Sequence, residues 1–174
     1  METSEILRKL EKAVPGAVVN QGFIGQSRDA LIYVQAGLLR EVATFLKQEP
    51  TIGLDWLDNL SVFQDGDLLK ATYFLRSRIH SHGLILRSVI SLGSSGKEVD
   101  FPSVSAIWEM AESFEVESGE LFGVRYTTPA GERAHRPFQR LPKEWSGYPL
   151  RKRYVFPSEF LGISHTRKIE VESK

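Results

Sequence analysis

The middle of this 174-residue chain alternates apolar and polar residues at the period of a β-strand, and this pattern limits the fold more than any other feature. Asp-Gly between two such runs is a strong hairpin signal, because glycine accepts the positive φ that a tight turn requires. The sequence therefore predicts an antiparallel meander of three strands. The runs cover residues 56–64, 69–79 and 84–92, and the turns between them are Asp65-Gly66-Asp67 and Ser81-His82-Gly83.

Helical and extended patterns alternate before the meander. We expect a helix over residues 4–13, two short strands over 17–19 and 30–34, and a second helix over 37–48, which Pro50 ends. The order helix, two strands, helix, three strands predicts a two-layer α+β domain. Its sheet would be mixed but mostly antiparallel, with the helices on one face and an irregular C-terminal extension.

The pattern weakens after residue 100. It predicts two short helices, over 104–110 and 113–122, the second closed by Gly123. We therefore divide the chain into an α+β core over 1–126, with both short helices between 103 and 122, and an irregular C-terminal interaction extension over 127–174. Five prolines argue against long regular elements in the extension: Pro129, Pro137, Pro142, Pro149 and Pro157. An irregular tail of this length usually packs against another surface.

Composition excludes several functions. Lys plus Arg and Asp plus Glu number 22 each, so no overall field attracts nucleic acid or anionic lipid. The absence of cysteine excludes disulfides, cysteine-ligated iron–sulfur clusters and thiol nucleophiles. No apolar run reaches the ~18 residues of a membrane span, and the acidic start differs from a secretory signal. We therefore expect a cytosol-like compartment.

Charge is nevertheless unevenly placed along the chain. Acids without any Lys or Arg occupy 98–120, and bases dominate 125–153, where Trp145, Tyr148 and Leu150 lie among them. Either the two blocks pair with each other, or each faces a partner subunit. The aromatic residues favour an interface, because aromatics and arginine are enriched where proteins dock.

The sequence offers only weak signals for catalysis. His80 and His82 are the best metal candidates, but they lie at a predicted turn without a third ligand at motif spacing, which favours a polar hairpin. Glu112, Glu115, Glu117 and Glu120 are better explained as helix acids and ion-pair partners than as an acid and base pair. We expect no catalytic residue, no metal ligand and no cofactor.

Two motifs together cover roughly a third of the chain. The first combines Pro102-Ser103-Val104, Ile107-Trp108, Glu115-Val116-Glu117 and residues 121–126. The second is Leu141-Pro142-Lys143-Glu144-Trp145-Ser146-Gly147-Tyr148-Pro149-Leu150-Arg151-Lys152-Arg153-Tyr154. They resemble the 30 kDa subunit family of respiratory complex I, whose bacterial form is the C subunit of NADH-quinone oxidoreductase and whose second motif runs Leu-Pro-x-x-Trp-x-Gly-x-Pro-Leu-Arg-Lys-Asp-Tyr. Val116, Glu120, Tyr148 and Arg153 depart from the family pattern and indicate a divergent member.

The resemblance implies a cofactor-free subunit of a peripheral arm, on the cytoplasmic side of the membrane and bound to it only through the complex. Its partners would be the large quinone-site subunit, which is the 49 kDa or D-type subunit, and the iron–sulfur subunits. The resemblance implies that these residues form the subunit interface: Glu115, Glu117, Phe122, Gly123, Arg125, Trp145, Gly147, Pro149, Leu150, Arg151, Lys152 and Tyr154. In the complex, Arg151 and Lys152 would make charge-assisted bonds across the contact or within it.

Three alternatives stay open. The chain could serve a related energy-converting hydrogenase or a ferredoxin-linked complex, or act as an adaptor in a complex without electron transfer. It could also bind RNA through residues 125–153, with Tyr126, Trp145 and Tyr148 as stacking platforms.

Overall fold

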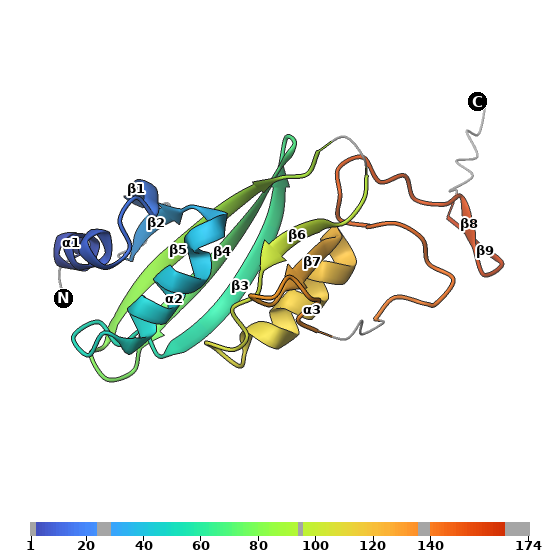
Figure 1. The fold of residues 1–174 in the computed structure, drawn as a ribbon. Coiled ribbons are helices and arrows are strands. Elements are labelled where there is room, and N and C mark those ends of the chain that lie inside the picture. Colours follow the sequence, from blue (N-terminus) through green and yellow to red (C-terminus); the bar gives the residue numbers. More distant parts are fainter. Residues whose placement is uncertain (1–2, 24–28, 94–95, 136–139, 166–174) are drawn as a thin grey trace, which may run out of the picture.

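The computed structural model describes residues 3–23, 29–93, 96–135 and 140–165. A twisted five-stranded sheet is crossed on one side by α2 and α3, and the segment after β7 projects from the end near α3 (Figure 1). The first half contains α1 (Thr3–Ala13), β1 (Val18–Phe23), β2 (Ala30–Val34), the 3-10 turn η1 (Ala36–Leu38) and α2 (Leu39–Gln48). The second half contains β3 (Trp56–Asp65), β4 (Leu68–Ser77), β5 (His82–Ser91), β6 (Val99–Pro102), α3 (Ala111–Phe122), β7 (Val124–Thr127), β8 (Glu159–Phe160) and β9 (Ile163–Ser164).

The predicted meander is confirmed. β3, β4 and β5 pair antiparallel, and Gly66 adopts φ 58° in the turn between β3 and β4. The strand order is β1-β2-β5-β4-β3, and β2 runs parallel to β5. The sheet is therefore mixed and mostly antiparallel, as the α+β prediction requires.

The core lies between the sheet and the helices. Residues on one face of β4, from Leu69 through Tyr73 to Leu75, are buried, because successive side chains of a strand point to opposite faces. Leu10 of α1 and Leu46 of α2 pack in the same cluster, both with 0% exposed surface. Burying such a side chain is worth about 1.5–3 kcal/mol, so this layer supplies most of the stability.

The predicted helix over 104–110 is wrong. Residues 105–107, 109 and 110 form turns instead, because the Trp108 indole is drawn into the core, where its Nε1 donates to the Leu54 carbonyl at 2.9 Å. The backbone N–H of Val104 donates at 2.8 Å to the Glu115 carboxylate. The second predicted helix is confirmed as α3, which begins two residues earlier than expected.

A parallel pair, β6 with β7, was not predicted. Each strand has four residues, too few for a clear period, and α3 connects them. Thr127, assigned to the irregular extension, is the last residue of β7. Arg40 of α2 donates to the carbonyls of Ser103 and Thr127, which fixes this small unit to the main layer.

The chain becomes irregular after β7, in agreement with the expected extension. Its described residues carry only the short antiparallel pair β8 and β9. None of the helices in the described ranges combines the length and apolarity that crossing a membrane requires.

Candidate functional site

Glu115 joins three segments in the interior. Its side chain has no exposed surface, and its carboxylate accepts bonds from the Ser103 hydroxyl at 2.6 Å and from His135 Nε2 at 2.6 Å. The Val104 N–H is its third donor. A buried carboxylate needs such donors to offset its lost hydration. Glu115, predicted at the interface, therefore holds α3 against the segments before and after it.

The acidic and basic blocks pair with each other. Arg125 binds Asp100, Arg133 Nη2 lies 2.6 Å from Glu98 Oε2, and Arg140 Nη1 lies 3.2 Å from Glu117 Oε1. Glu120 accepts the backbone N–H groups of Arg140 and Leu141. The Arg125 guanidinium lowers the pKa of Asp100 through their hydrogen bonds. Of the two explanations of the charge pattern, the pairing within the chain is the one that the described residues realise.

Arg151 closes the C-terminal end of α3. Its guanidinium donates to the carbonyls of Phe122 at 2.7 Å and Gly123 at 3.1 Å, and also to those of Gly96 and Lys97. The last carbonyls of a helix lack partners within it, so Arg151 supplies them from outside. The Tyr148 ring stacks on this guanidinium at 4.4 Å. The charge-assisted bonds expected of Arg151 are thus made within the chain.

Gly123 permits this contact. It adopts φ 70°, and a Cβ built there would lie 2.6 Å from both Arg151 Nη2 and the Tyr148 ring. Phe122, before it, is buried with 8% exposure. Both predicted interface residues therefore lie beneath the extension, where the absence of a Cβ at Gly123 lets Arg151 approach.

Trp145 is the centre of an aromatic cluster inside the extension. It stacks on Tyr154 with ring centroids 6.1 Å apart and meets the edges of Phe156 and Phe160 at 5.6 Å and 5.0 Å. Gly147, at φ 81°, lies so close to Tyr154 that a Cβ would approach that ring to 2.8 Å. The cluster gives the extension a small core of its own.

The end of the second motif reaches back to the sheet. The Lys152 N–H donates to Gln64 Oε1 at 2.8 Å, and Arg153 Nη2 lies 3.2 Å from Asp67 Oδ1. The Leu150 N–H donates to the Leu121 carbonyl of α3 at 3.1 Å. Pro149 lies half-buried beside them. The extension is thus attached to both α3 and the β3–β4 hairpin.

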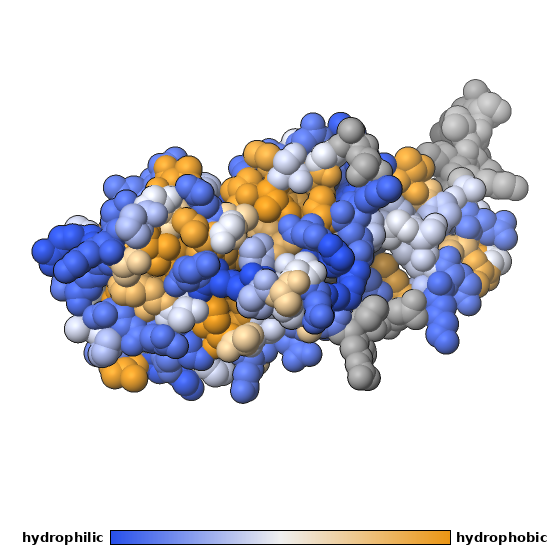
Figure 2. All heavy atoms as spheres, viewed as in Figure 1, coloured by the Kyte–Doolittle hydropathy of each residue, from blue (hydrophilic) through white to orange (hydrophobic). Residues whose placement is uncertain are grey.

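Apolar side chains on the outside of the extension are the feature that sequence reasoning missed. Val155 is 84% exposed, and Leu161 and Ile163 are each 66% exposed. Phe156 adds to them at 58%, and Leu150, which the sequence did predict at the interface, is 50% exposed. Figure 2 shows apolar atoms at the β8–β9 end, apart from the apolar area over the sheet. The available signal was the pair Val155-Phe156 directly before Pro157, in a segment without helical or strand period.

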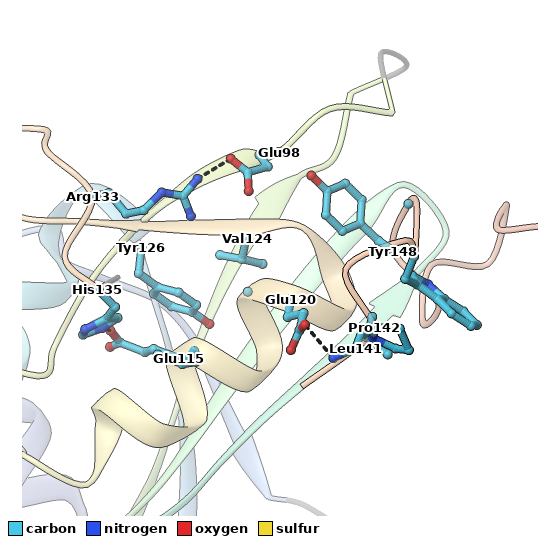
Figure 3. A pocket seen from close by; sticks show the side chains of 14 residues that line it. Glu98, Glu115, Glu120, Val124, Tyr126, Arg133, His135, Leu141, Pro142 and Tyr148 are labelled. Carbon is cyan, nitrogen blue, oxygen red and sulfur yellow. Dashed lines mark hydrogen bonds and ion pairs between the residues drawn. The ribbon is translucent and has the colours of Figure 1, made fainter. Parts of the chain in front are cut away.

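A hollow of about 350 Å³ lies between α3 and the extension (Figure 3). Its charged lining is engaged: Glu98 with Arg133, Glu115 with His135, and Glu120 with the backbone of residue 141. Within the described ranges, no three His, Asp or Glu side chains gather as a metal site would require. His80 and His82 stack at 5.9 Å, and His80 Nε2 contacts the Pro50 carbonyl. These contacts favour a structural role for the hollow, as a packed contact between α3 and the extension, over a catalytic role.

The three proposed RNA platforms are occupied. Tyr126 is 3% exposed and shares a hydrogen bond with Ser118 at 2.8 Å. Trp145 and Tyr148 stack on Tyr154 and Arg151. Each of the three rings is thus already engaged by a partner within the described residues.

Comparisons with known proteins agree on one family. The profile described as "Respiratory-chain NADH dehydrogenase, 30 Kd subunit" matches residues 32–159. The C subunit of NADH-quinone oxidoreductase from Roseiflexus castenholzii is 27% identical over 158 residues, which cover 87% of this chain and 83% of the relative. The J subunit of NAD(P)H-quinone oxidoreductase from Synechococcus sp. strain RCC307 is 33% identical over 121 residues, covering 67% and 64%.

The fold also occurs in a solved complex. A chain in the structure of the membrane-bound sulfane sulfur reductase, an archaeal respiratory membrane complex, superposes with a TM-score of 0.60. The match covers 81% of this chain and 78% of that chain at 17% identity, so it shows a common fold.

Proposed function

The chain belongs to the 30 kDa subunit family of the respiratory-chain NADH dehydrogenase, and we propose that it docks against the large quinone-site subunit of a complex I-like electron-transfer complex. The α+β core acts as a rigid support, and the extension is the docking element. The observation that carries this proposal is the group of apolar side chains exposed on the described part of the extension: Leu150, Val155, Phe156, Leu161 and Ile163.

The exposed apolar side chains lie on a segment that the rest of the chain holds in place. Apolar side chains in water cost free energy that a partner recovers by covering them, at about 25 cal/mol per Å². Here they lie on a segment fixed to α3 by Arg151 and to the β3–β4 hairpin by Lys152 and Arg153. A segment held in place in advance loses less conformational entropy on binding.

The predicted interface residues have different parts in this proposal. Leu150 and Lys152, both exposed, would contact the partner directly. Glu115, Phe122, Gly123 and Arg151 would act indirectly, by holding the extension against α3. Glu117 and Arg125 keep half-exposed side chains in ion pairs beside the joint, and Trp145, Gly147, Pro149 and Tyr154 shape the extension itself.

Membership in such a complex also implies where the chain would lie. We propose that the chain lies in the peripheral arm on the cytoplasmic side, next to the iron–sulfur subunits, and meets the membrane only through the complex. It would hold no cofactor of its own, and the lack of cysteine agrees with this role.

Co-purification tests the docking proposal. A tagged copy expressed in its native host should recover the large quinone-site subunit and the iron–sulfur subunits. V155D and I163D each place a charge on the exposed apolar surface and should reduce that recovery at least tenfold, since burying an unpaired carboxylate is costly. V19D is the matched control, because Val19 is 65% exposed on β1, far from the extension in the fold.

Two results would overturn the proposal. One is full recovery of the large subunit with both extension variants, and the other is recovery of proteins unrelated to electron transfer. If the partners are those of an energy-converting hydrogenase or a ferredoxin-linked complex, the docking mode stands and the type of complex changes.

A further inference from the structure

The face of the sheet turned away from the core carries a polar and aromatic cluster that the docking role does not use. Leu84 and Leu86 of β5 pack in the core, and successive side chains of a strand point to opposite faces, so Arg87 lies on the other face. Arg87 lies on β5, the central strand of the five. Strand register sets Tyr33 of β2 directly beside it on one side and Thr72 of β4 on the other. Phe63 of β3 completes the group. We call these four residues the Arg87 cluster.

The Arg87 guanidinium lies between two rings. Its centre is 5.5 Å from the centroid of Tyr33 and 5.3 Å from that of Phe63. Its Nε donates to Thr72 Oγ1 at 2.9 Å, and its Nη1 donates to the Tyr33 hydroxyl at 3.1 Å. The side chain is therefore fixed in position while Nη2 donates to none of the described residues.

Arg87 has no ion-pair partner among the described residues. In the part of the chain that the structure describes, no carboxylate oxygen lies within 4.0 Å of its guanidinium. Its neighbours on β4 differ: Lys70 Nζ lies 2.6 Å from Asp65, and Arg76 Nε lies 2.9 Å from Asp58. A half-buried guanidinium that contacts only neutral groups has lost hydration energy, and no opposite charge compensates for that loss.

We propose that the Arg87 cluster is a second docking point, which receives one Asp or Glu side chain from another protein subunit of the assembly. The carboxylate would bind the guanidinium through both terminal nitrogens, the geometry that arginine favours. The Tyr33 and Phe63 rings would flank it and exclude water, which strengthens the pair. Fixed arginine and aromatic side chains are enriched among the residues that dominate binding energy.

The charge arrangement favours a single carboxylate over a nucleic acid strand. A strand carries a phosphate at every nucleotide and needs a row of free cations. On this face Lys70 and Arg76 beside Arg87 are already paired with Asp65 and Asp58, so among the described residues of β4 and β5 on this face Arg87 is the positive centre left without a carboxylate. A protein side chain matches one centre.

Zero-length coupling tests the proposal in the intact assembly. R87K keeps the charge and places an amine where a partner carboxylate is expected, and a carbodiimide joins an amine to a carboxylate only when the two are in contact. After treatment of the native complex, mass spectrometry should find the R87K amine bonded to an Asp or Glu of another subunit. R8K is the matched control, because Arg8 is exposed on α1 without an ion-pair partner among the described residues.

Affinity gives a second readout. R87M should weaken retention of that subunit at least tenfold, because it would leave the partner carboxylate buried and unpaired. R87Q, which can still bond Thr72 and Tyr33, should weaken it to a similar degree. Thermal unfolding of the isolated R87Q chain, unchanged from the wild type, would assign the loss to the charge.

The proposal for the Arg87 cluster rests on membership in the proposed complex. Its failure can nevertheless be distinguished from failure of the docking through the extension. Coupling of the R87K amine only within its own chain, or no coupling while other subunit contacts still form, would overturn it. So would binding of single-stranded RNA that R87M abolishes. In each case co-purification of the large subunit through the extension would persist, so the docking proposal would stand.

Discussion

His135 Nε2 lies 2.6 Å from the Glu115 carboxylate, a contact that joins α3 to the chain 20 residues further on. Glu115 is fully buried, and His135 is 9% exposed. The bond connects α3 with the start of the extension, so its loss should affect both.

E115Q should lower the free energy of unfolding by about 1–3 kcal/mol, because one of the three donors to the carboxylate would face an amide N–H₂ instead of an oxygen. Urea denaturation measures the change. E112Q on the same helix is the control, since Glu112 is 67% exposed, and it should shift stability by less than about 0.5 kcal/mol. Equal effects of the two variants would contradict the assigned role of Glu115.

G123A should loosen the extension. The new Cβ would meet Arg151 and Tyr148 at 2.6 Å, in addition to about 1–2 kcal/mol for a left-handed alanine. Limited proteolysis should then cut within 140–165 at least tenfold faster. G131A separates the two causes, because Gly131 has φ 80° and nothing within 4 Å of its Cβ position. A similar cleavage rate in both variants would assign the whole effect to backbone strain.

R151M should free the extension from the end of α3. Four carbonyl groups, those of Gly96, Lys97, Phe122 and Gly123, would lose a charged donor. We expect faster hydrogen exchange of the backbone amides in 148–156 with α1 and the meander unaffected. K152M removes an adjacent exposed cation whose attachment to Gln64 uses only the backbone, so exchange should stay as in the wild type. Protection retained in R151M would refute the attachment through Arg151.

Asp55 should make stability depend on acid pH. The Arg78 N–H donates to Asp55 Oδ1 at 2.9 Å, and this bond, together with the Arg78 side chain, lowers the pKa of Asp55 from its ordinary 3.8. A lowered pKa in the folded state stabilises the protein above pH 3.8, and this contribution disappears as the pH falls through the folded value.

D55N should therefore reduce the free energy of unfolding at pH 7 by about 1 kcal/mol, and the difference from the wild type should shrink toward pH 3. Denaturant titrations at several pH values measure it. D58N is the control, because Asp58 forms an exposed pair with Arg76 and should have little effect at any pH. A deficit of D55N that grows on acidification would contradict the argument.

Local sequence signals predicted the larger elements well. Asp65-Gly66-Asp67 predicted the first hairpin, because glycine there adopts the positive φ that the turn needs. The pair β6 and β7 was missed because four residues carry no clear period and their pairing depends on α3 between them. Val104 to Met110 looked helical, but the packing of Trp108 in the core overrode that local preference.

Part of the candidate site was likewise predictable from local sequence, and part of it was not. The motif around Trp145 was visible because its residues are contiguous, and so was the excess of opposite charges that later proved to pair. The Arg87 cluster was not visible, since the parallel register of β2 and β5 brings Tyr33 beside a residue 54 positions away. Contacts of this kind follow from sheet topology, which local pattern does not specify.

The attachments of the extension at Gly96, Gln64 and Asp67 span 55 to 88 residues of sequence. Because closing such long loops is slow, we expect the extension to settle only after the meander and α3 have formed. A half-finished or misfolded copy would present no ordered surface to its neighbours. Under the docking proposal, only a chain that has completed its folding would present the surface that the partner subunit binds.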